Sequence, residues 1–193
     1  MTFPKTLALL GAALLSLAAC GETPDSSFLA PAQPSFKASA ATVVKSTVRR
    51  ERPLTRDLTT SVTVTRAGGV IELPEAGLKV VVPQDALPIG TASMTLTVTA
   101  LKGKAIAYEF GPHGTQFNRP LVLTQDIRGS EWKGGKKQAP LAVSYFATPA
   151  DLDAVAGVVA EREELPAQLD GGSTLRWNVW HFSGYTVVWG RKP

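Results

Sequence analysis

Alternation of apolar residues with threonine is the feature that most constrains the fold of this chain. In the segment 94–99, Met, Leu and Val occupy every second position and threonine occupies the positions between them. Successive side chains of a strand point to opposite faces, so a period of two places one face in a core and the other in water. The segment therefore predicts a strand of an antiparallel sheet with one solvated face.

Similar short runs recur between Leu58 and the C-terminus, separated by turns that contain Gly and Pro. They cover residues 58–65, 70–73, 78–82, 94–99, 105–110, 121–125, 141–147, 157–162, 175–180 and 185–189. Many short strands between such turns are typical of a sandwich or barrel. We therefore expect an all-β fold, an antiparallel β-sandwich, over residues 57–193. One short helix is expected near 149–156, because Thr148, Pro149 and Asp151 have the pattern of a helix N-terminus.

The N-terminus has the pattern of an export signal. Lys5 precedes an uncharged run, 6–19, which is rich in Leu and Ala. That run is shorter than the about 20 residues of a membrane span but suits a signal peptide over residues 1–19. It ends in Leu-Ala-Ala followed by Cys20, the single cysteine of the chain. This ending resembles a bacterial lipobox; ordinary secretion with a coincidental cysteine is the alternative.

The lipobox resemblance implies that Cys20 is diacylglycerylated and becomes the mature N-terminus, which attaches the protein to a membrane. Acyl chains anchor by burying CH₂ groups, at about 0.8 kcal/mol each. The residue after the cysteine is Gly21 rather than aspartate. In a host with two membranes, this absence of aspartate favours the outer membrane or the cell surface. We therefore expect a lipid-anchored protein of the cell envelope.

Residues 20–56 have the composition of a flexible tether, rich in Ser, Ala, Thr and Pro. The chain has a formal net charge of +4, and a basic group stands at the end of this stretch: Lys45, Arg49, Arg50, Arg52 and Arg56. These charges are expected to be solvated in a linker. Contact with anionic lipid or a cell-wall polymer is the alternative, and nucleic acid is not expected as a partner of an exported chain.

Three stretches resemble the ZU-five domain, a β-sandwich module of ankyrins, Unc-five netrin receptors and tight-junction proteins that also occurs in bacterial exported proteins. They read GGVIELPEAGLKVVVPQDAL from Gly68, YEFGPHGTQFNRPLVLT from Tyr108 and HFSGYTV from His181. Their order and spacing cover about residues 66–189, and the stretch from Ser130 to Leu165 departs most. The resemblance implies a ZU-five-like sandwich. From its position, Phe117 is expected to fill the core and Pro120 to begin a strand, where a missing N–H costs least.

The sequence His181-Phe182-Ser183 is the one candidate for chemistry. In some relatives of the module, and in one nucleoporin, His-Phe-Ser cleaves itself: the serine hydroxyl attacks the preceding carbonyl with histidine as general base, and the amide becomes a hydrolysable ester. Here the bond between Phe182 and Ser183 would break, provided that the peptide is strained. In the alternative interpretation the three residues form a structural corner, which Gly184 relaxes.

Other catalytic classes find little support. Two histidines and one cysteine are too few for a convincing zinc site, and no cofactor is implied. Asp151 and Asp153 are better explained by a helix start than by calcium. Three acidic residues, Glu161, Glu163 and Glu164, are expected on a solvated strand edge.

Tryptophans supply the candidate binding residues. Trp177 and Trp180 fall on opposite faces of a strand that begins at Leu175, so one is expected in the core and the other outside. An exposed tryptophan could anchor a sugar or a protein partner, and packing beneath a loop is the alternative. Trp180 and Trp132 are the candidates. The sequence thus predicts a lipid-anchored envelope protein, without enzymatic activity, whose sandwich is a structural or binding module for an envelope protein or polysaccharide.

Overall fold

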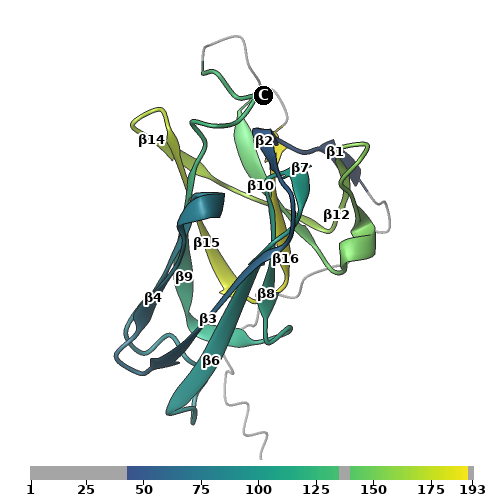
Figure 1. Ribbon diagram of the computed structural model, residues 1–193. Helices are drawn as coiled ribbons and strands as arrows, with labels where there is room; N and C mark the ends of the chain where they lie inside the picture. Colours follow the sequence, from purple (N-terminus) through teal and green to yellow (C-terminus); the bar gives the residue numbers. More distant parts are fainter. Residues whose placement is uncertain (1–42, 135–139, 191–193) are drawn as a thin grey trace, which may run out of the picture. The chain divides into compact units, whose positions relative to one another are not determined.

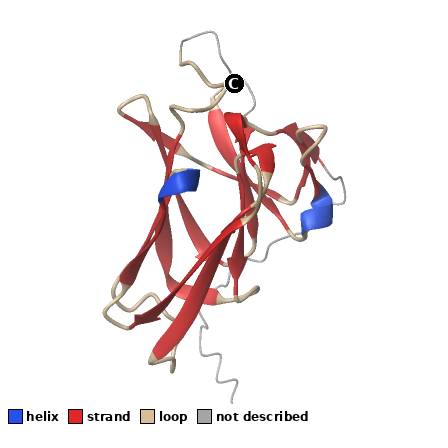
Figure 2. Cartoon of the chain, viewed as in Figure 1, coloured by secondary structure: helices blue, strands red, loops and turns tan. Residues whose placement is uncertain are grey.

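The computed structural model describes residues 43–134 and 140–190, and the described part of the chain is an all-β fold built from antiparallel strands (Figures 1 and 2). Three predictions lie outside the described residues: the signal peptide 1–19, the acylated Cys20, and the tether up to residue 42. Among the residues that are described, no helix has the length and apolar character needed to cross a membrane.

Two sheets form the sandwich. In spatial order, the six-stranded sheet contains β13 (Glu163–Leu165), β10 (Leu141–Phe146), β16 (Gly184–Trp189), β8 (Ala107–Gly111), β6 (Ser93–Ala100) and β3 (Leu58–Thr65). The five-stranded sheet contains β14 (Gln168–Asp170), β15 (Thr174–His181), β9 (Gln116–Asp126), β5 (Leu78–Val82) and β4 (Gly69–Leu73). The antiparallel sandwich predicted from the period of two is therefore confirmed, and each predicted run lies in or overlaps a strand.

The inner faces of both sheets carry the core. On β6, Leu96 and Val98 are fully buried, whereas the threonines between them lie on the solvated face. Phe182, between β15 and β16, is also fully buried. The centre of its ring lies 5.2 Å from that of Phe110 on β8 and 4.7 Å from that of Phe117 on β9. Phe117 thus fills the core as expected, and these rings join the two sheets.

A third, smaller sheet covers part of the outer face of the six-stranded sheet. It consists of β1 (Val43–Ser46), β12 (Val158–Glu161) and β11 (Leu152–Asp153). Val159 of β12 packs in a second apolar cluster with outward-facing side chains of β10 and β16, including Phe146 and Val188. The outer faces of β10 and β16 are therefore dry, while the outer face of β3 and β6 stays in water.

The last part of the stretch predicted as a tether, residues 43–54, belongs to the folded domain. Residues predicted to be linker form β1 and β2 (Arg49–Leu54), and β2 pairs with β7 (Gly103–Ala105). The Lys45 side chain is 7% exposed, and its ammonium forms ion pairs with Glu161, at 3.7 Å, and with Glu164. The expectation of a solvated basic linker is therefore wrong for Lys45, and the expected solvated edge is wrong for Glu161, whose side chain is 8% exposed.

Arg50 is a second buried cation and belongs to a polar network that links the sheets. Its guanidinium donates to the carbonyl oxygen of Ala105 and, over 3.1 Å, to the hydroxyl of Tyr108. That hydroxyl lies within hydrogen-bonding distance of Gln125 Oε1 on β9 and 2.9 Å from the carbonyl oxygen of Ala76. Burial raises the pKa of Tyr108 to about 12, against the opposing effect of Arg50, so the phenol stays protonated at neutral pH.

The predicted helix near 149–156 is wrong in length. The chain forms one 3₁₀ turn, η2 (Pro149–Asp151), and then enters β11. The Asp151 carboxylate accepts from the backbone N–H of Thr148 over 3.1 Å, as in a capping box. In the next turn, the Asp153 carboxylate accepts from the N–H of Val155 over 2.9 Å. Both aspartates therefore cap turns, and pairing of β11 with β12 stops the helix.

Pro120 lies inside β9 rather than at its start. Opposite it, the register between β9 and β15 shifts: Val179 pairs with Leu121, whereas His181 pairs with Gln116. A bulge tolerates a residue without an N–H, so the proline occupies the irregular part of the strand. The bulge lies one residue before the end of β15, next to the corner formed by His181-Phe182-Ser183.

Candidate functional site

The corner at residues 181–183 is tied to the turn that follows β8. The N–H of Phe182 donates to the carbonyl oxygen of Thr115 over 3.0 Å, and its carbonyl oxygen accepts from the N–H of Gly114, also over 3.0 Å. The carbonyl oxygen of Ser183 accepts from the N–H of Phe110 over 3.1 Å. The peptide that self-cleavage would break is therefore held on both sides by ordinary backbone hydrogen bonds.

The His181 imidazole is half-buried beside two tyrosines. Its Nδ1 lies 3.3 Å from the Tyr185 hydroxyl, which donates to the His181 carbonyl oxygen over 2.7 Å. The Tyr145 ring packs edge-on against the imidazole at 5.1 Å. Burial lowers the pKa of His181, with Glu163 acting in the opposite direction. Burial also raises the pKa of Tyr185 above its ordinary value. The imidazole thus has a hydroxyl partner, and that partner is Tyr185.

The Ser183 hydroxyl has a different partner. It is 5% exposed, and Oγ donates to the carbonyl oxygen of Phe146 over 3.3 Å. Among the described residues other than glycine, only Asp85 has a positive φ, 57°, so Phe182 and Ser183 lie outside the left-handed region. His181 and the Ser183 hydroxyl are close in the chain, but in the fold the imidazole lies beside Tyr185 and the hydroxyl donates to Phe146.

Gly184 has a packing role that the sequence does not reveal. It lies opposite Phe146 in the pairing of β16 with β10, and a Cβ at this position would overlap three carbon atoms of the Phe146 ring. Its φ is not in the left-handed region. The interpretation that Gly184 relaxes the corner is therefore replaced by a packing role. The absence of a side chain at residue 184 leaves the space that the Phe146 ring occupies.

This geometry predicts that the bond between Phe182 and Ser183 stays intact. Intact-mass spectrometry of the purified wild type and of Ser183→Ala should give one species each, at the mass of the uncleaved mature chain. A wild-type fragment that begins at Ser183 and is missing in Ser183→Ala would contradict the prediction and restore the autoproteolytic interpretation.

The tryptophans are placed as the alternation predicts. Trp177 is 3% exposed and packs in the core, while Trp180 is 55% exposed on the outer face of the five-stranded sheet. Trp132 is partly buried and packs against the main core. Trp180 therefore remains a candidate binding residue, whereas Trp132 is held in a packing role.

Two rows of side chains cross the outer face beside Trp180. The register pairs Asn178 with Val122, Val122 with Val81, and Val81 with Val70, which is 44% exposed. A neighbouring polar row crosses all five strands: Gln168, Arg176, Thr124, Lys79 and Glu72. We call these two rows together with Trp180 the Trp180 face. These valines were not singled out in the sequence, although the period of two in β4 and β5 places Val70 and Val81 outward.

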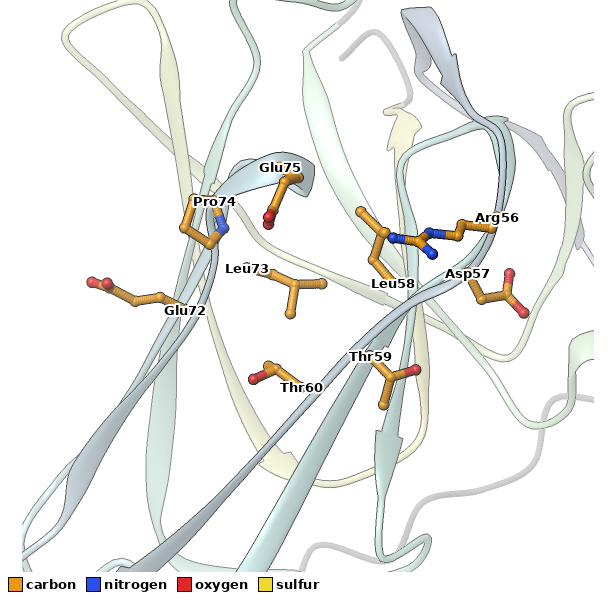
Figure 3. A pocket seen from close by; sticks show the side chains of 9 residues that line it. All are labelled: Arg56, Asp57, Leu58, Thr59, Thr60, Glu72, Leu73, Pro74 and Glu75. Atoms are coloured by element: carbon orange, nitrogen blue, oxygen red, sulfur yellow. The ribbon is translucent and has the colours of Figure 1, made fainter.

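A pocket of about 510 Å³ opens at one edge of the sandwich, between the start of β3 and the corner formed by β4 and η1 (Pro74–Ala76) (Figure 3). Its lining is mostly polar: Arg56, Asp57, Leu58, Thr59, Thr60, Glu72, Leu73, Pro74 and Glu75. In Figure 3 the guanidinium of Arg56 extends toward the gap, whereas the carboxylates of Asp57 and Glu72 point away from it. The pocket leaves one flank of β3 accessible.

Comparison with known proteins adds no assignment to this geometry. No family model matches the chain, and no curated protein matches its sequence.

Proposed function

We propose that the protein is a lipid-anchored module of the cell envelope that binds a glycan polymer of the envelope through the Trp180 face. In this proposal Cys20 carries the acyl chains, and in a host with two membranes the protein lies in the outer membrane or at the cell surface. The sandwich is a ZU-five-like binding module without catalytic activity. The exposure of Trp180, 55% on the outer face of β15, is the observation that carries the proposal.

The chemistry of the Trp180 face suits a sugar polymer. An exposed indole offers a flat apolar surface on which the C–H groups of a pyranose can pack. The polar row lies two residues along the strands from the row of valines and offers amide, hydroxyl and charged groups, such as Gln168 and Thr124, for sugar hydroxyls. Lys79 and Glu72 are already paired over 2.9 Å, and Arg176 is paired with Asp170 of β14, so each charge of the row has a partner. A flat, mixed surface of this kind fits an extended chain better than a small ligand, which needs a concave site.

Lipid attachment is tested directly at Cys20. Cells that express the full chain and are fed a labelled fatty acid should yield a labelled protein that partitions into detergent. Cys20→Ala should lose both the label and the partitioning, because no other cysteine is present in the chain. Equal labelling of the two proteins, or of neither, would contradict the anchor.

Glycan binding is tested at Trp180. We expect Trp180→Ala to reduce cosedimentation with insoluble peptidoglycan at least 10-fold, as for a central aromatic anchor. Its free energy of unfolding should change by less than about 1 kcal/mol, because the side chain lies on the surface. Val155→Ala is the matched control, since Val155 is 90% exposed in the turn before β12, on the third sheet. Unchanged binding of Trp180→Ala, or equal loss in both variants, would contradict the proposal.

A further inference from the structure

The connection between β3 and β4 is closed at its turn and open at the other end. At the turn, Gly68 N–H donates to the carbonyl oxygen of Thr65 over 2.9 Å, and Asp85 N–H donates to that of Arg66 over 2.8 Å. Farther from the turn the two strands belong to different sheets, because β3 pairs with β6 and β4 pairs with β5. The pocket of about 510 Å³ lies at this open end (Figure 3). It therefore results from the divergence of the sheets rather than from the position of one side chain.

The floor of the pocket is apolar. Leu73, at the end of β4, is 4% exposed and belongs to the main core. Leu58, at the start of β3, is partly buried against the same core, and Pro74 also lines the pocket. Such a floor suits methylene groups of a ligand, whereas the polar groups around it decide which ligand is bound.

Two side chains of opposite charge face this floor from opposite sides. In Figure 3 the Arg56 guanidinium extends toward the gap from the side of β3, and the Glu75 carboxylate points toward it from η1. Both side chains are exposed. Within the part of the chain that the structure describes, neither forms an ion pair, with each other or with a third group. One cation and one anion are therefore available to a ligand.

The other carboxylates of the pocket are engaged elsewhere. Asp57 accepts from the backbone N–H of Lys102 over 2.7 Å, and Glu72 pairs with Lys79 over 2.9 Å. Both carboxylates point away from the gap (Figure 3). A further polar group of the lining is the hydroxyl of Thr60, which has no hydrogen-bond partner among residues 43–134 and 140–190. The free groups of the pocket thus carry one positive charge, one negative charge and one hydroxyl.

We propose that this pocket binds the zwitterionic head of an α-amino acid. The carboxylate of the head accepts from the Arg56 guanidinium, whose planar fork can donate two parallel N–H bonds to it. The ammonium of the head donates to the Glu75 carboxylate, and the methylene groups of the amino acid pack on Leu58 and Leu73. A ligand with a single charge would leave either Arg56 or Glu75 without a partner. An ammonium and a carboxylate on the same carbon atom satisfy both.

The amino acid has two possible sources. It can be free, or it can end a side chain of a larger molecule, because the pocket lies at an edge of the sandwich where a bulky ligand can approach. The site does not include Trp180, so the proposal does not depend on glycan binding by the Trp180 face.

The first test is an NMR titration of the mature chain with Cys20→Ser, which prevents acylation. Norleucine is the probe, because it joins a zwitterionic head to an apolar stem. We expect the backbone amide signals of Leu58, Thr60 and Leu73 to shift and saturate. N-acetylnorleucine lacks the ammonium and norleucinamide lacks the carboxylate, so each should bind about 10-fold more weakly, as for the loss of one charge-assisted hydrogen bond.

Two variants assign the charges. Glu75→Gln should lose the preference for norleucine over N-acetylnorleucine, and Arg56→Gln should lose the preference for norleucine over norleucinamide. Asp57→Asn is the matched control: its side chain lines the same pocket but points away, and the asparagine oxygen can still accept from Lys102. Both preferences should persist in this control. Equal binding of the three probes by the parent chain, or unchanged preferences in Glu75→Gln and Arg56→Gln, would overturn the proposal.

A further titration distinguishes the two sources. If the amino acid is carried on a polymer, soluble peptidoglycan fragments with free amino groups should shift the same signals, and fragments acetylated with acetic anhydride should not. If the site takes free amino acids, norleucine alone should shift them. Signals that move with neither ligand would overturn the proposal. Trp180→Ala should bind norleucine like the parent chain, so failure at this pocket and failure of glycan binding at the Trp180 face give different results.

Discussion

Replacing Gly184 by alanine is expected to destabilise the domain by about 3 kcal/mol, near the upper end for overpacking of a buried site. The new methyl group would occupy the space of the Phe146 ring, which is fully buried in the cluster beneath the third sheet. The ring has no solvent to move into, so either the pairing of β16 with β10 or the cover provided by β12 must shift. Denaturant unfolding of the purified variant measures the loss.

Two comparisons identify the cause of that loss. Gly129→Ala is the matched control, because no atom lies within 4 Å of its Cβ position and its φ is not left-handed; its free energy of unfolding should stay within about 0.5 kcal/mol of the wild type. If the Phe146 ring is the obstacle, adding Gly184→Ala to Phe146→Ala should cost much less than adding it to the wild type. Equal costs in both backgrounds would show that the ring is not responsible.

Replacing Arg50 by alanine is expected to destabilise the domain by about 3 kcal/mol, as for the loss of a buried, hydrogen-bonded charge. The variant would leave the Ala105 carbonyl oxygen without its donor and remove the cation that lies 5.6 Å from the centre of the Tyr108 ring. It would also leave a void beside β2. Arg52→Ala, in the same strand but exposed, is the matched control and should change the free energy of unfolding by less than about 0.5 kcal/mol.

The pair of arginine variants decides between two accounts of the basic stretch. If residues 43–56 were a solvated linker, both variants would be equally mild. A large loss of unfolding free energy in Arg50→Ala alone would show that β2 unfolds cooperatively with the rest of the domain. Equal and small effects would contradict the position of Arg50 in the network with Tyr108 and Gln125.

Strands with one solvated face could be predicted from the sequence because the period of two is local. The threonines of β6 face water and the apolar residues between them face the core, as the alternation requires. The same rule placed Trp177 and Trp180 on opposite faces, and the structure shows that Trp177 is the buried one. Such predictions depend only on neighbours in the chain, so they need no knowledge of tertiary partners.

Features that depend on distant partners could not be predicted in this way. Arg50 resembles a linker residue until Ala105 and Tyr108 supply its acceptors. The sequence alone suggests that Gly184 makes the corner flexible, because the nearby Phe146 ring comes from a distant strand. The short strands β13 and β14 have three residues each, too few for any periodicity to be read.

The same limit applies to the candidate site. His181 and Ser183 are neighbours in sequence, but the partners of their side chains, Tyr185 and Phe146, lie on other strands. Local sequence could therefore identify the residues of the corner, whereas their hydrogen-bond partners follow from the tertiary fold. For the Trp180 face, local sequence supplied the tryptophan, and strand order supplied the rows beside it.

Binding through the Trp180 face is tested most directly by the indole N–H signals of the four tryptophans in a two-dimensional NMR spectrum. The mature chain with Cys20→Ser is titrated with soluble peptidoglycan fragments, and the signal of Trp180 is assigned from Trp180→Phe. We expect that signal to shift and saturate while the signal of the buried Trp177 stays in place. A Trp180 signal that does not move at saturating glycan would contradict the account, as would equal shifts of all four signals.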